Sequence, residues 1–303
     1  MIYLILKGRI GNQLFMFSTA YTLWRMRGSK ELIVIDDVDN QCHNYLNSLM
    51  EYPLENVKFV HDRKYLNSYK YWLKKRDYIK YQIAVSKMSY REKYLYELKN
   101  QIKFNRKGLF ICENGYMDYP VKMPRNILVD GYFQSEKFFE KYKDEIIKIF
   151  SLKEKVDHSN YPNLELIRSR NTVCLSIKVQ HNVGSEMYDV CSKEYWEQAI
   201  QYITEHVENP LFFVCSDNVS YVKENLIDCN RYDIIEQASD YPVHISLAVM
   251  AQCKHFIIGN TSFGWWAQYL CENENKIVVT PSRWYGIDVP CDIYQENWHS
   301  IEV

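Results

Sequence analysis

The chain has 303 residues, of which 47% are hydrophobic and 25% charged, and its formal net charge is −1. This is an ordinary globular composition, and the length suits one large domain or two of moderate size. The N-terminal apolar run before Lys7 is too short for a signal peptide, and no stretch approaches the ~20 apolar residues of a membrane span. We therefore expect a cytoplasmic protein.

Along the first half, the sequence predicts a β-α-β unit. An apolar strand at residues 2–6 leads into a tight turn, and a helix follows from about residue 12 to 27, where Gly28 stops it. A second strand is expected at 31–35. Residues 60–106 read as surface-lying helices, and a further strand is expected at 126–130.

The segment from residue 61 to 108 is strongly basic. It holds 14 Lys or Arg against 4 Asp or Glu, whereas the remainder holds 23 against 34, and it is rich in aromatic residues. A solvated pair of helices would explain the charge. Contact with an anionic membrane surface, or with an anionic lipid-linked acceptor, would explain it as well. Nucleic acid is not favoured, because no DNA- or RNA-binding motif accompanies the charge.

A second β/α series follows the polar, turn-rich residues 151–164. Its predicted strands are 172–179, 211–215, 232–235, 255–259 and 276–280, and its predicted helices are 193–205, 219–226, 243–252 and a Trp-rich helix ending at 270. Strand-then-helix alternation favours parallel sheets. We therefore expect an α/β protein with two Rossmann-like domains facing a cleft, one at residues 1–155 with a basic helical insertion at 60–108, the other at 156–303.

Ligands of such sheets bind beyond the carboxyl ends of the strands, and this rule selects four stretches of polar residues. They are residues 8–13, 178–181, 216–217 and 260–263. Lys178 supplies a cation where a phosphate could lie. Asp217 suits a base or ribose, but it would also suit the cap of the next helix.

The stretch Asn260-Thr261-Ser262 joins a strand to a helix. Asn260 or Thr261 could cap that helix and leave free N–H groups for a phosphate, or the stretch could be a plain cap. The turn at 8–13 lacks the third glycine of a dinucleotide fingerprint. Its large polar residues Arg9, Asn12 and Gln13 suit contacts with sugar and phosphate instead. These features favour a two-domain nucleotide-sugar enzyme.

Metal and cofactor sites are not expected. The nine cysteines form no Cys-x-x-Cys pair, and no His/Cys cluster has the spacing of a zinc site. An odd, scattered set in a chain without a signal peptide indicates reduced thiols.

Five blocks of the sequence resemble glycosyltransferase family 11, the bacterial α-1,2-fucosyltransferases. They run in order along the chain: GRIGNQLF at 8–15, DGYFQSEKFF at 130–139, FFVCSD at 212–217, CKHFIIGNTSFGWWA at 253–267 and VVTPSRW at 278–284. The resemblance implies a GT-B-like fold and metal-independent, inverting transfer of L-fucose from GDP-β-L-fucose to a galactose hydroxyl. The product would be an α-1,2-linked oligosaccharide, such as a repeat unit of an O-antigen or capsule.

The resemblance also assigns roles to residues. The C-terminal domain would bind the donor, with Asp217 at the guanine, and Asn260, Thr261, Ser262 and Phe263 around the diphosphate and fucose. Arg9 and Asn12 would reach the reacting groups from the N-terminal domain, and Gln13 would lie on the acceptor side.

The family's central His-x-Arg-Arg-x-Asp motif aligns with residues 176–181, which read Ser-Ile-Lys-Val-Gln-His. Ser176 stands in place of the histidine, and only the cation of the first arginine survives, as Lys178. The departure leaves three readings: a fucosyltransferase with a variant donor site, an enzyme for another nucleotide sugar, or a non-catalytic nucleotide- or sugar-binding relative.

Inverting transfer calls for a base near the acceptor hydroxyl. His181, Glu186 and Asp189 follow the strand and are the candidates on its loop. His181 has a suitable ordinary pKa near 6.5 and is the first choice, with Glu186 and Asp189 placed on the acceptor side.

Overall fold

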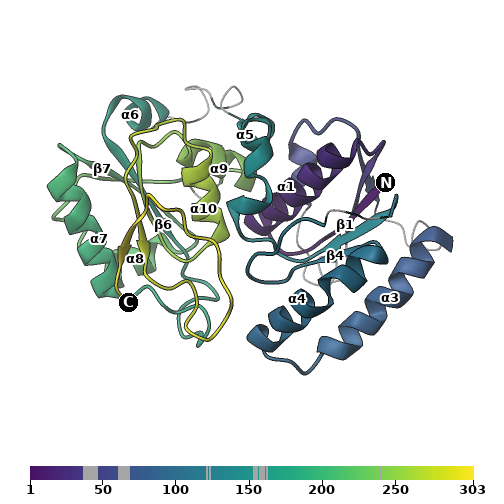
Figure 1. Ribbon diagram of the computed structural model, residues 1–303. Helices are drawn as coiled ribbons and strands as arrows, with labels where there is room; N and C mark the ends of the chain where they lie inside the picture. Colours follow the sequence, from purple (N-terminus) through teal and green to yellow (C-terminus); the bar gives the residue numbers. More distant parts are fainter. Residues whose placement is uncertain are drawn as a thin grey trace. The chain divides into compact units, whose positions relative to one another are not determined.

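A computed structural model of the chain describes residues 1–36, 47–60, 69–120, 122, 124–152, 156, 161, 163–238 and 240–303, and the side chains of residues 36 and 69–75 lie outside this description. The chain divides into two compact units. Unit 1 comprises Met1–Ile149 and Asp288–Tyr294, and unit 2 comprises Phe150–Ile287 and Gln295–Val303. Each unit has its own sheet with helices packed on it (Figure 1).

The sheet of unit 1 has five strands in the order β3-β2-β1-β5-β4, and every pairing is parallel. The strands are β1 Ile2–Leu6, β2 Leu32–Asp36, β3 Val57–Val60, β4 Leu109–Ile111 and β5 Ile127–Asp130. The helices are α1 Ile10–Arg27, α3 Tyr69–Val85, α4 Tyr90–Arg106 and α5 Lys143–Phe150, with 3-10 turns at η1 Ser48–Glu51, η3 Glu136–Phe138 and η4 Glu140–Tyr142. The predicted β-α-β opening and the strand near 126–130 are confirmed, and β3 and β4 were not predicted.

Helix α1 is buried on nearly all sides along most of its length and ends at a glycine. Its residues from Ile10 to Leu23 are mostly buried, and Gly28 ends it in the left-handed conformation with φ 53°. The N–H of Gly28 donates to the carbonyl of Arg25 at 3.2 Å. Only glycine adopts this conformation without a steric penalty from Cβ, so the predicted stop is confirmed.

Helices α3 and α4 form a hairpin beside β4 (Figure 1). A capping box starts α4, in which Ser89 and Glu92 satisfy each other's backbone N–H groups. The rings of Tyr81 on α3 and Phe104 on α4 meet edge to face with centroids 5.7 Å apart. The predicted helical segment is thus confirmed from residue 69 onward, whereas residues 61–68 lie outside the described residues.

Unit 2 holds a six-stranded sheet in the order β11-β10-β9-β6-β7-β8, again parallel throughout. The strands are β6 Thr172–Ile177, β7 Leu211–Ser216, β8 Ile234–Glu236, β9 His255–Ile258, β10 Val278–Pro281 and β11 His299–Ile301. The helices are α6 Leu164–Ser169, α7 Lys193–His206, α8 Val219–Asn225, α9 Val243–Met250 and α10 Ser262–Tyr269. All five predicted strands and four predicted helices are present, and β11 and α6 were not predicted.

Strand β6 lies at the centre of this second sheet, between β7 and β9. Ile177 pairs with Ser216 of β7, and Ser176 pairs with Ile258 of β9. The residues that follow these three strands therefore emerge side by side at one edge of the sheet. None of the described helices is long and apolar enough to span a membrane.

Candidate functional site

Three polar residues predicted for the site, Lys178, Asp217 and Asn260, follow adjacent strands of unit 2. Lys178 comes directly after β6, Asp217 directly after β7, and Asn260 two residues after the end of β9. The register of these strands brings the three residues to the same carboxyl edge. This is the edge at which parallel sheets bind their ligands.

Lys178 and Asp217 form an ion pair with each other. The ammonium of Lys178 bonds one carboxylate oxygen of Asp217, and the other oxygen accepts the N–H of Val179 at 2.8 Å. The carboxylate thus fixes the backbone just after β6. The alternative that Asp217 caps the next helix is wrong, because Asn218 caps α8 by accepting the N–H of Tyr221 at 3.1 Å.

The start of α10 is capped by Thr261, whose hydroxyl accepts the N–H of Gly264 at 3.1 Å. Asn260 is not the N-cap of α10 and makes other contacts. Its buried amide donates to the carbonyls of Tyr188 at 3.1 Å and of Trp284 at 3.0 Å, and so ties two loops to the end of β9. Ser262 and Phe263 lie half-buried in the first turn of α10.

Ser176 is buried inside β6 and packs against the first turn of α10. A Cβ added at Gly264 would lie 2.7 Å from the Ser176 hydroxyl oxygen, closer than real Cβ contacts allow. Position 176 therefore sets how closely α10 approaches β6. Ser176 is not among the residues that line the hollow described next, although its carbonyl accepts the N–H of Gly259, which does line it.

A hollow of about 600 Å³ lies at this edge of unit 2. It is lined by Ile177, Lys178, Asn182, Val183, Tyr188, Asp189, Val190, Cys191, Ser192, Lys193, Trp196, Tyr221, Asn225, Leu226, Gly259, Asn260, Thr261, Arg283 and Val303. Four predicted residues are among them: Lys178, Asp189, Asn260 and Thr261. The volume falls in the range of small-molecule sites.

Arg283 and Lys193 also line this hollow, and the sequence reasoning did not single them out. Arg283 lies two residues after β10, so the same strand-end rule that selected Lys178 would have found it. Its guanidinium offers the planar, bidentate geometry that suits a phosphate, which Lys178 cannot provide. Lys178, Lys193 and Arg283 thus line the hollow together with the carboxylate of Asp189, which accepts the N–H of Gly184 at 2.7 Å.

His181 and Glu186 are exposed on the loop after β6 and do not line the hollow. His181 has φ 66°, a left-handed conformation that is uncommon outside glycine. The carbonyl of Glu186 lies against Gly286, where an added Cβ would be 2.2 Å away. The loop is therefore held by close backbone packing on one side while these two side chains face solvent.

The predicted residues of unit 1 follow β1. Arg9 is exposed just before α1, and the Asn12 side-chain oxygen accepts from the Gln134 amide at 2.9 Å. Gln13 is fully buried: its amide donates to the carbonyl of Gly8 at 2.8 Å and accepts the N–H of Ser48 at 2.9 Å. The Gln13 side chain thus braces the backbone of unit 1.

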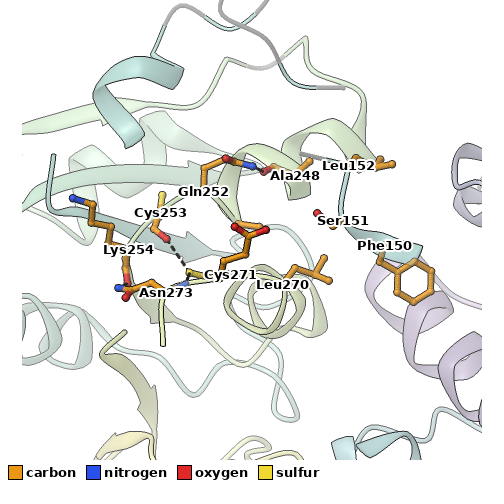
Figure 2. Close-up of a pocket in the computed structure, with 12 residues that line it drawn as sticks. Phe150, Ser151, Leu152, Ala248, Gln252, Cys253, Lys254, Leu270, Cys271 and Asn273 are labelled. Atoms are coloured by element: carbon orange, nitrogen blue, oxygen red, sulfur yellow. Dashed lines mark hydrogen bonds between the residues drawn. The ribbon is translucent and has the colours of Figure 1, made fainter. Parts of the chain in front are cut away.

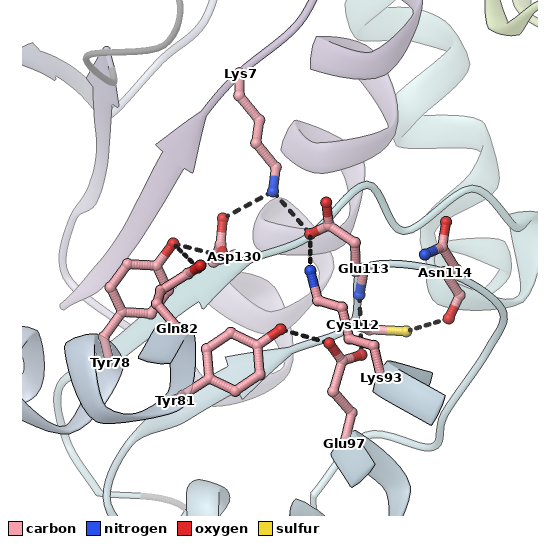
Figure 3. Close-up of polar contacts among 10 residues, drawn as sticks. All are labelled: Lys7, Tyr78, Tyr81, Gln82, Lys93, Glu97, Cys112, Glu113, Asn114 and Asp130. Carbon is pink, nitrogen blue, oxygen red and sulfur yellow. Dashed lines mark hydrogen bonds and ion pairs between the residues drawn. The ribbon is translucent and has the colours of Figure 1, made fainter. Parts of the chain in front are cut away.

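A partly buried ionic cluster at the carboxyl end of the unit 1 sheet was not predicted (Figure 3). Lys7, just after β1, contacts Glu113 at 2.8 Å and Asp130 at 3.4 Å, and Lys93 of α4 lies 3.8 Å from Glu113. Burial lowers the pKa of Lys7, but the two carboxylates outweigh it and raise that pKa well above its usual value. Burial raises the pKa of Glu113, and Lys7 and Lys93 bring it below its usual value.

Beside this cluster, Glu97 of α4 is buried and accepts a hydrogen bond from the Tyr81 hydroxyl at 2.5 Å (Figure 3). Its other oxygen accepts the N–H of Glu113 at 3.1 Å. Burial raises the pKa of Glu97 to about 7, and these hydrogen bonds only partly oppose the shift. Glu97 thus joins the helical hairpin to the segment after β4.

A second hollow in unit 2, of about 110 Å³, lies near the start of β9 (Figure 2). The Cys271 thiol contacts the carbonyl of Cys253 at 3.1 Å on its wall, between Lys254 and Leu270. It contains none of the predicted residues and is too small for a nucleotide. Across the described ranges, no three His, Cys, Asp or Glu side chains gather in a way that could hold a metal ion.

Comparison with known proteins adds family and fold. The family model for glycosyl transferase family 11 matches residues 1–302. An O-antigen biosynthesis glycosyltransferase, WbnK of Escherichia coli, is 24% identical and covers 98% of this chain and 99% of its own length. An α-1,2-colitosyltransferase of Escherichia coli is 26% identical over 57% of this chain and 61% of its own length. Galactoside α-(1,2)-fucosyltransferase 2 of Oryctolagus cuniculus is 27% identical over 52% of this chain and 47% of its own length.

Solved structures share the fold at low identity. NodZ α-1,6-fucosyltransferase soaked with GDP-fucose is 12% identical, with a TM-score of 0.55 over 95% of this chain and 99% of that one. The fucosyltransferase NodZ from Bradyrhizobium gives a TM-score of 0.52 at 12% identity, over 88% of this chain and 91% of that one. The predicted α/β class with two Rossmann-like, GT-B-like domains is confirmed by this likeness and by the two parallel sheets.

Proposed function

The chain belongs to glycosyl transferase family 11, and on that premise we propose that it transfers L-fucose from GDP-β-L-fucose to a galactose hydroxyl of an oligosaccharide, forming an α-1,2 linkage. The observation that carries the proposal is the cation-lined hollow at the carboxyl edge of the unit 2 sheet. Its position and its charge suit a nucleoside diphosphate.

In the proposed reaction, the acceptor hydroxyl oxygen attacks C1 of fucose as the bond from C1 to the diphosphate oxygen breaks. Inversion at C1 converts the β-linked donor into an α-linked product. GDP leaves with the bonding electron pair, so negative charge grows on its phosphate oxygens. Lys178, Arg283 and the first turn of α10, with Thr261, Ser262 and Phe263, are proposed to stabilise that charge without a metal ion.

Most of the remaining predicted residues keep their proposed roles. Asp217 is assigned to the guanine, and Arg9 and Asn12 to the reacting groups from the side of unit 1. His181 is the proposed base that takes the proton of the acceptor hydroxyl, with Glu186 and Asp189 as alternatives on the acceptor side. Ser176 and Gln13 are buried. We therefore propose that Ser176 positions the backbone beside the hollow of unit 2, and that Gln13 positions the backbone after β1 in unit 1.

We further propose that the acceptor is a lipid-linked repeat unit of a surface polysaccharide. The similarity to WbnK, which is named for O-antigen biosynthesis, supports this acceptor class. The enzyme would then work in the cytoplasm, in peripheral contact with the inner face of the membrane.

A different nucleotide-sugar donor is the second candidate. The changed motif at residues 176–181 favours it, and so does the relative named as a colitosyltransferase. A non-catalytic nucleotide- or sugar-binding protein is the third reading, and it rests on the changed motif alone.

The test is a donor panel. The purified protein is incubated with GDP-fucose, other GDP-sugars and UDP-sugars, each with lactose-type acceptors, and release of the nucleoside diphosphate is measured. Acceptor-dependent GDP release from GDP-fucose is the expected result. Release from a non-fucose donor alone would support the second candidate, whereas calorimetric GDP binding without turnover on any acceptor would support the third.

A further inference from the structure

Exposed apolar side chains concentrate on the helical hairpin of unit 1. Among the described residues, twelve large apolar side chains are exposed, and six of them lie on α3 and α4. They are Ile79, Ile83, Tyr90, Leu95, Leu98 and Ile102, of which Ile83 and Ile102 are 69% exposed. Scattered exposed apolar residues need no explanation, but a concentration on one element marks an interaction surface.

The apolar residues occupy the outward faces of the two helices. On α3, Tyr81 and Val85 are buried in the core of unit 1, and Ile79 and Ile83 lie about half a helical turn away from them. On α4, Phe104 is buried in the same core, and Leu95 and Ile102 lie on the opposite side. Both helices thus have a second apolar stripe that the fold of unit 1 does not bury.

The exposed surface of the hairpin is also basic. Residues 76–107 hold nine Lys or Arg and three Asp or Glu. Lys80, Lys87, Lys99, Lys103 and Arg106 are exposed and make no ion pair with any residue that the structure describes. Each acidic side chain is engaged: Asp77 bonds Lys107 at 2.7 Å, Glu92 belongs to the capping box, and Glu97 is buried.

We propose that this hairpin face is a docking surface for an anionic phospholipid membrane. The face is defined by the exposed apolar residues Ile79, Ile83, Leu95, Leu98 and Ile102 and by the five exposed cations just named. Apolar side chains would enter the boundary between headgroups and acyl chains while the basic side chains meet the lipid phosphates. Lysine stems reach outward to the headgroups while their methylenes lie on apolar surface, so both sets of residues act together.

Charge selects the lipid surface over other occupants. A second copy of the chain would bring two cationic faces together, which their mutual repulsion opposes. A nucleic acid would use the cations but leave the isoleucines and leucines exposed. An anionic membrane would contact both the basic and the apolar residues of the hairpin. Membrane binding also agrees with the proposed lipid-linked acceptor, and it can be tested without transferase activity.

The test is flotation of the full chain with two kinds of vesicle, phosphatidylcholine alone and equal parts of phosphatidylcholine and phosphatidylglycerol. We expect retention on the anionic vesicles at low salt, and loss of retention at high salt. Ile83→Asn with Ile102→Asn, and separately Lys99→Glu with Lys103→Glu, are each expected to lower the partition coefficient by at least about tenfold. Matched controls elsewhere are Leu166→Asn with Val243→Asn, and Lys30→Glu with Lys148→Glu.

Two further measurements distinguish a loss of membrane binding from a loss of folding. Thermal unfolding and GDP binding should be unchanged in all four variants, because the substituted side chains are exposed and lie outside the hollow of unit 2. Absence of retention on anionic vesicles, or equal losses in the control variants, would overturn the proposal. A wild-type dimer that Ile83→Asn with Ile102→Asn converts to a monomer would also overturn it and assign the face to self-association.

Discussion

The ammonium of Lys178 is paired with the carboxylate of Asp217, which also accepts the N–H of Val179 at 2.8 Å. Two residues that the sequence offers as separate ligand contacts therefore act as one unit. A diphosphate that approaches Lys178 must share its ammonium with Asp217. Substitutions at the two positions should consequently have different effects.

Lys178→Ala is expected to raise the donor KM or to lower kcat by about tenfold or more, the loss typical of a hydrogen bond to a charged group. The change also leaves the Asp217 carboxylate without its partner, near the proposed phosphate position. Steady-state kinetics with the donor identified by the panel would measure the effect. Lys223→Ala is the matched control, because Lys223 pairs with Glu236 at 2.6 Å and neither residue lines the hollow. A wild-type profile for Lys178→Ala would restrict Lys178 to its pairing with Asp217.

Asp217→Asn keeps an oxygen for the N–H of Val179 and removes the charge that holds Lys178. If Asp217 contacts the guanine, GDP binding should weaken by about tenfold more than UDP binding. Calorimetry with both nucleotides measures this ratio. Equal weakening of GDP and UDP would mean that Asp217 only holds Lys178 and the backbone after β6.

Arg283→Ala is expected to weaken GDP and UDP alike, by about tenfold, because both ligands share the diphosphate that a guanidinium clamps. Guanosine binding should be unaffected. Arg283→Lys should restore only part of the loss, since an ammonium lacks the bidentate fork. Arg231→Ala, an exposed arginine outside the hollow, is the control. A guanosine affinity that falls as much as the GDP affinity would remove Arg283 from the diphosphate.

Most of the strands that the sequence predicted have a strong local signal, although the short, partly exposed β8 was predicted as well. Strands β6 and β7 are near-continuous apolar runs, typical of strands buried on both faces of a parallel sheet. Strand β3 has a short, partly exposed sequence, and β4 and β11 have three residues each. These short strands exist through pairing with residues distant in the chain, which local patterning does not reveal.

The rule that ligands bind beyond the carboxyl ends of parallel strands predicted which residues lie at that edge of each sheet. It did not predict the direction in which their side chains point. It placed Lys178 and Asn260 at the hollow, but it could not tell that Gln13 turns inward to bond Gly8 and Ser48. Direction is decided by tertiary packing, because a buried amide must satisfy its hydrogen bonds. The sequence did not reveal the cluster around Lys7 either, because Glu113 lies more than a hundred residues away from Lys7 in the chain.

Glu97 should make stability depend on pH. Burial raises the folded-state pKa of Glu97 to about 7, above its ordinary value of 4.5. Between these values the folded protein binds more protons than the unfolded chain, so the contribution of Glu97 to stability is full below the lower value and falls as the pH rises to 7.

Glu97→Gln removes this titration. The free energy of unfolding of the wild type, relative to Glu97→Gln, is expected to fall by about 3 kcal/mol between pH 4.5 and 7.5. Urea titrations at several pH values measure it. Glu92→Gln is the control, because Glu92 is exposed on the same helix and its pKa is lowered by the Ser89 hydrogen bonds. A constant difference between the wild type and Glu97→Gln across this range would contradict the prediction.

Lys7→Met should destabilise unit 1 strongly. It leaves Glu113 and the buried Asp130 without their shared cation, and a buried carboxylate without a partner is costly. We expect a loss of about 3–5 kcal/mol in the free energy of unfolding, measured with urea. Arg25→Met is the control: Arg25 pairs with Glu145 at 2.6 Å with both side chains exposed, so its loss should be much smaller. Adding Glu113→Gln to Lys7→Met should recover part of the loss, because it removes one of the two carboxylates that lost Lys7. If Lys7→Met costs no more than Arg25→Met, the cluster does not stabilise the fold through its charges.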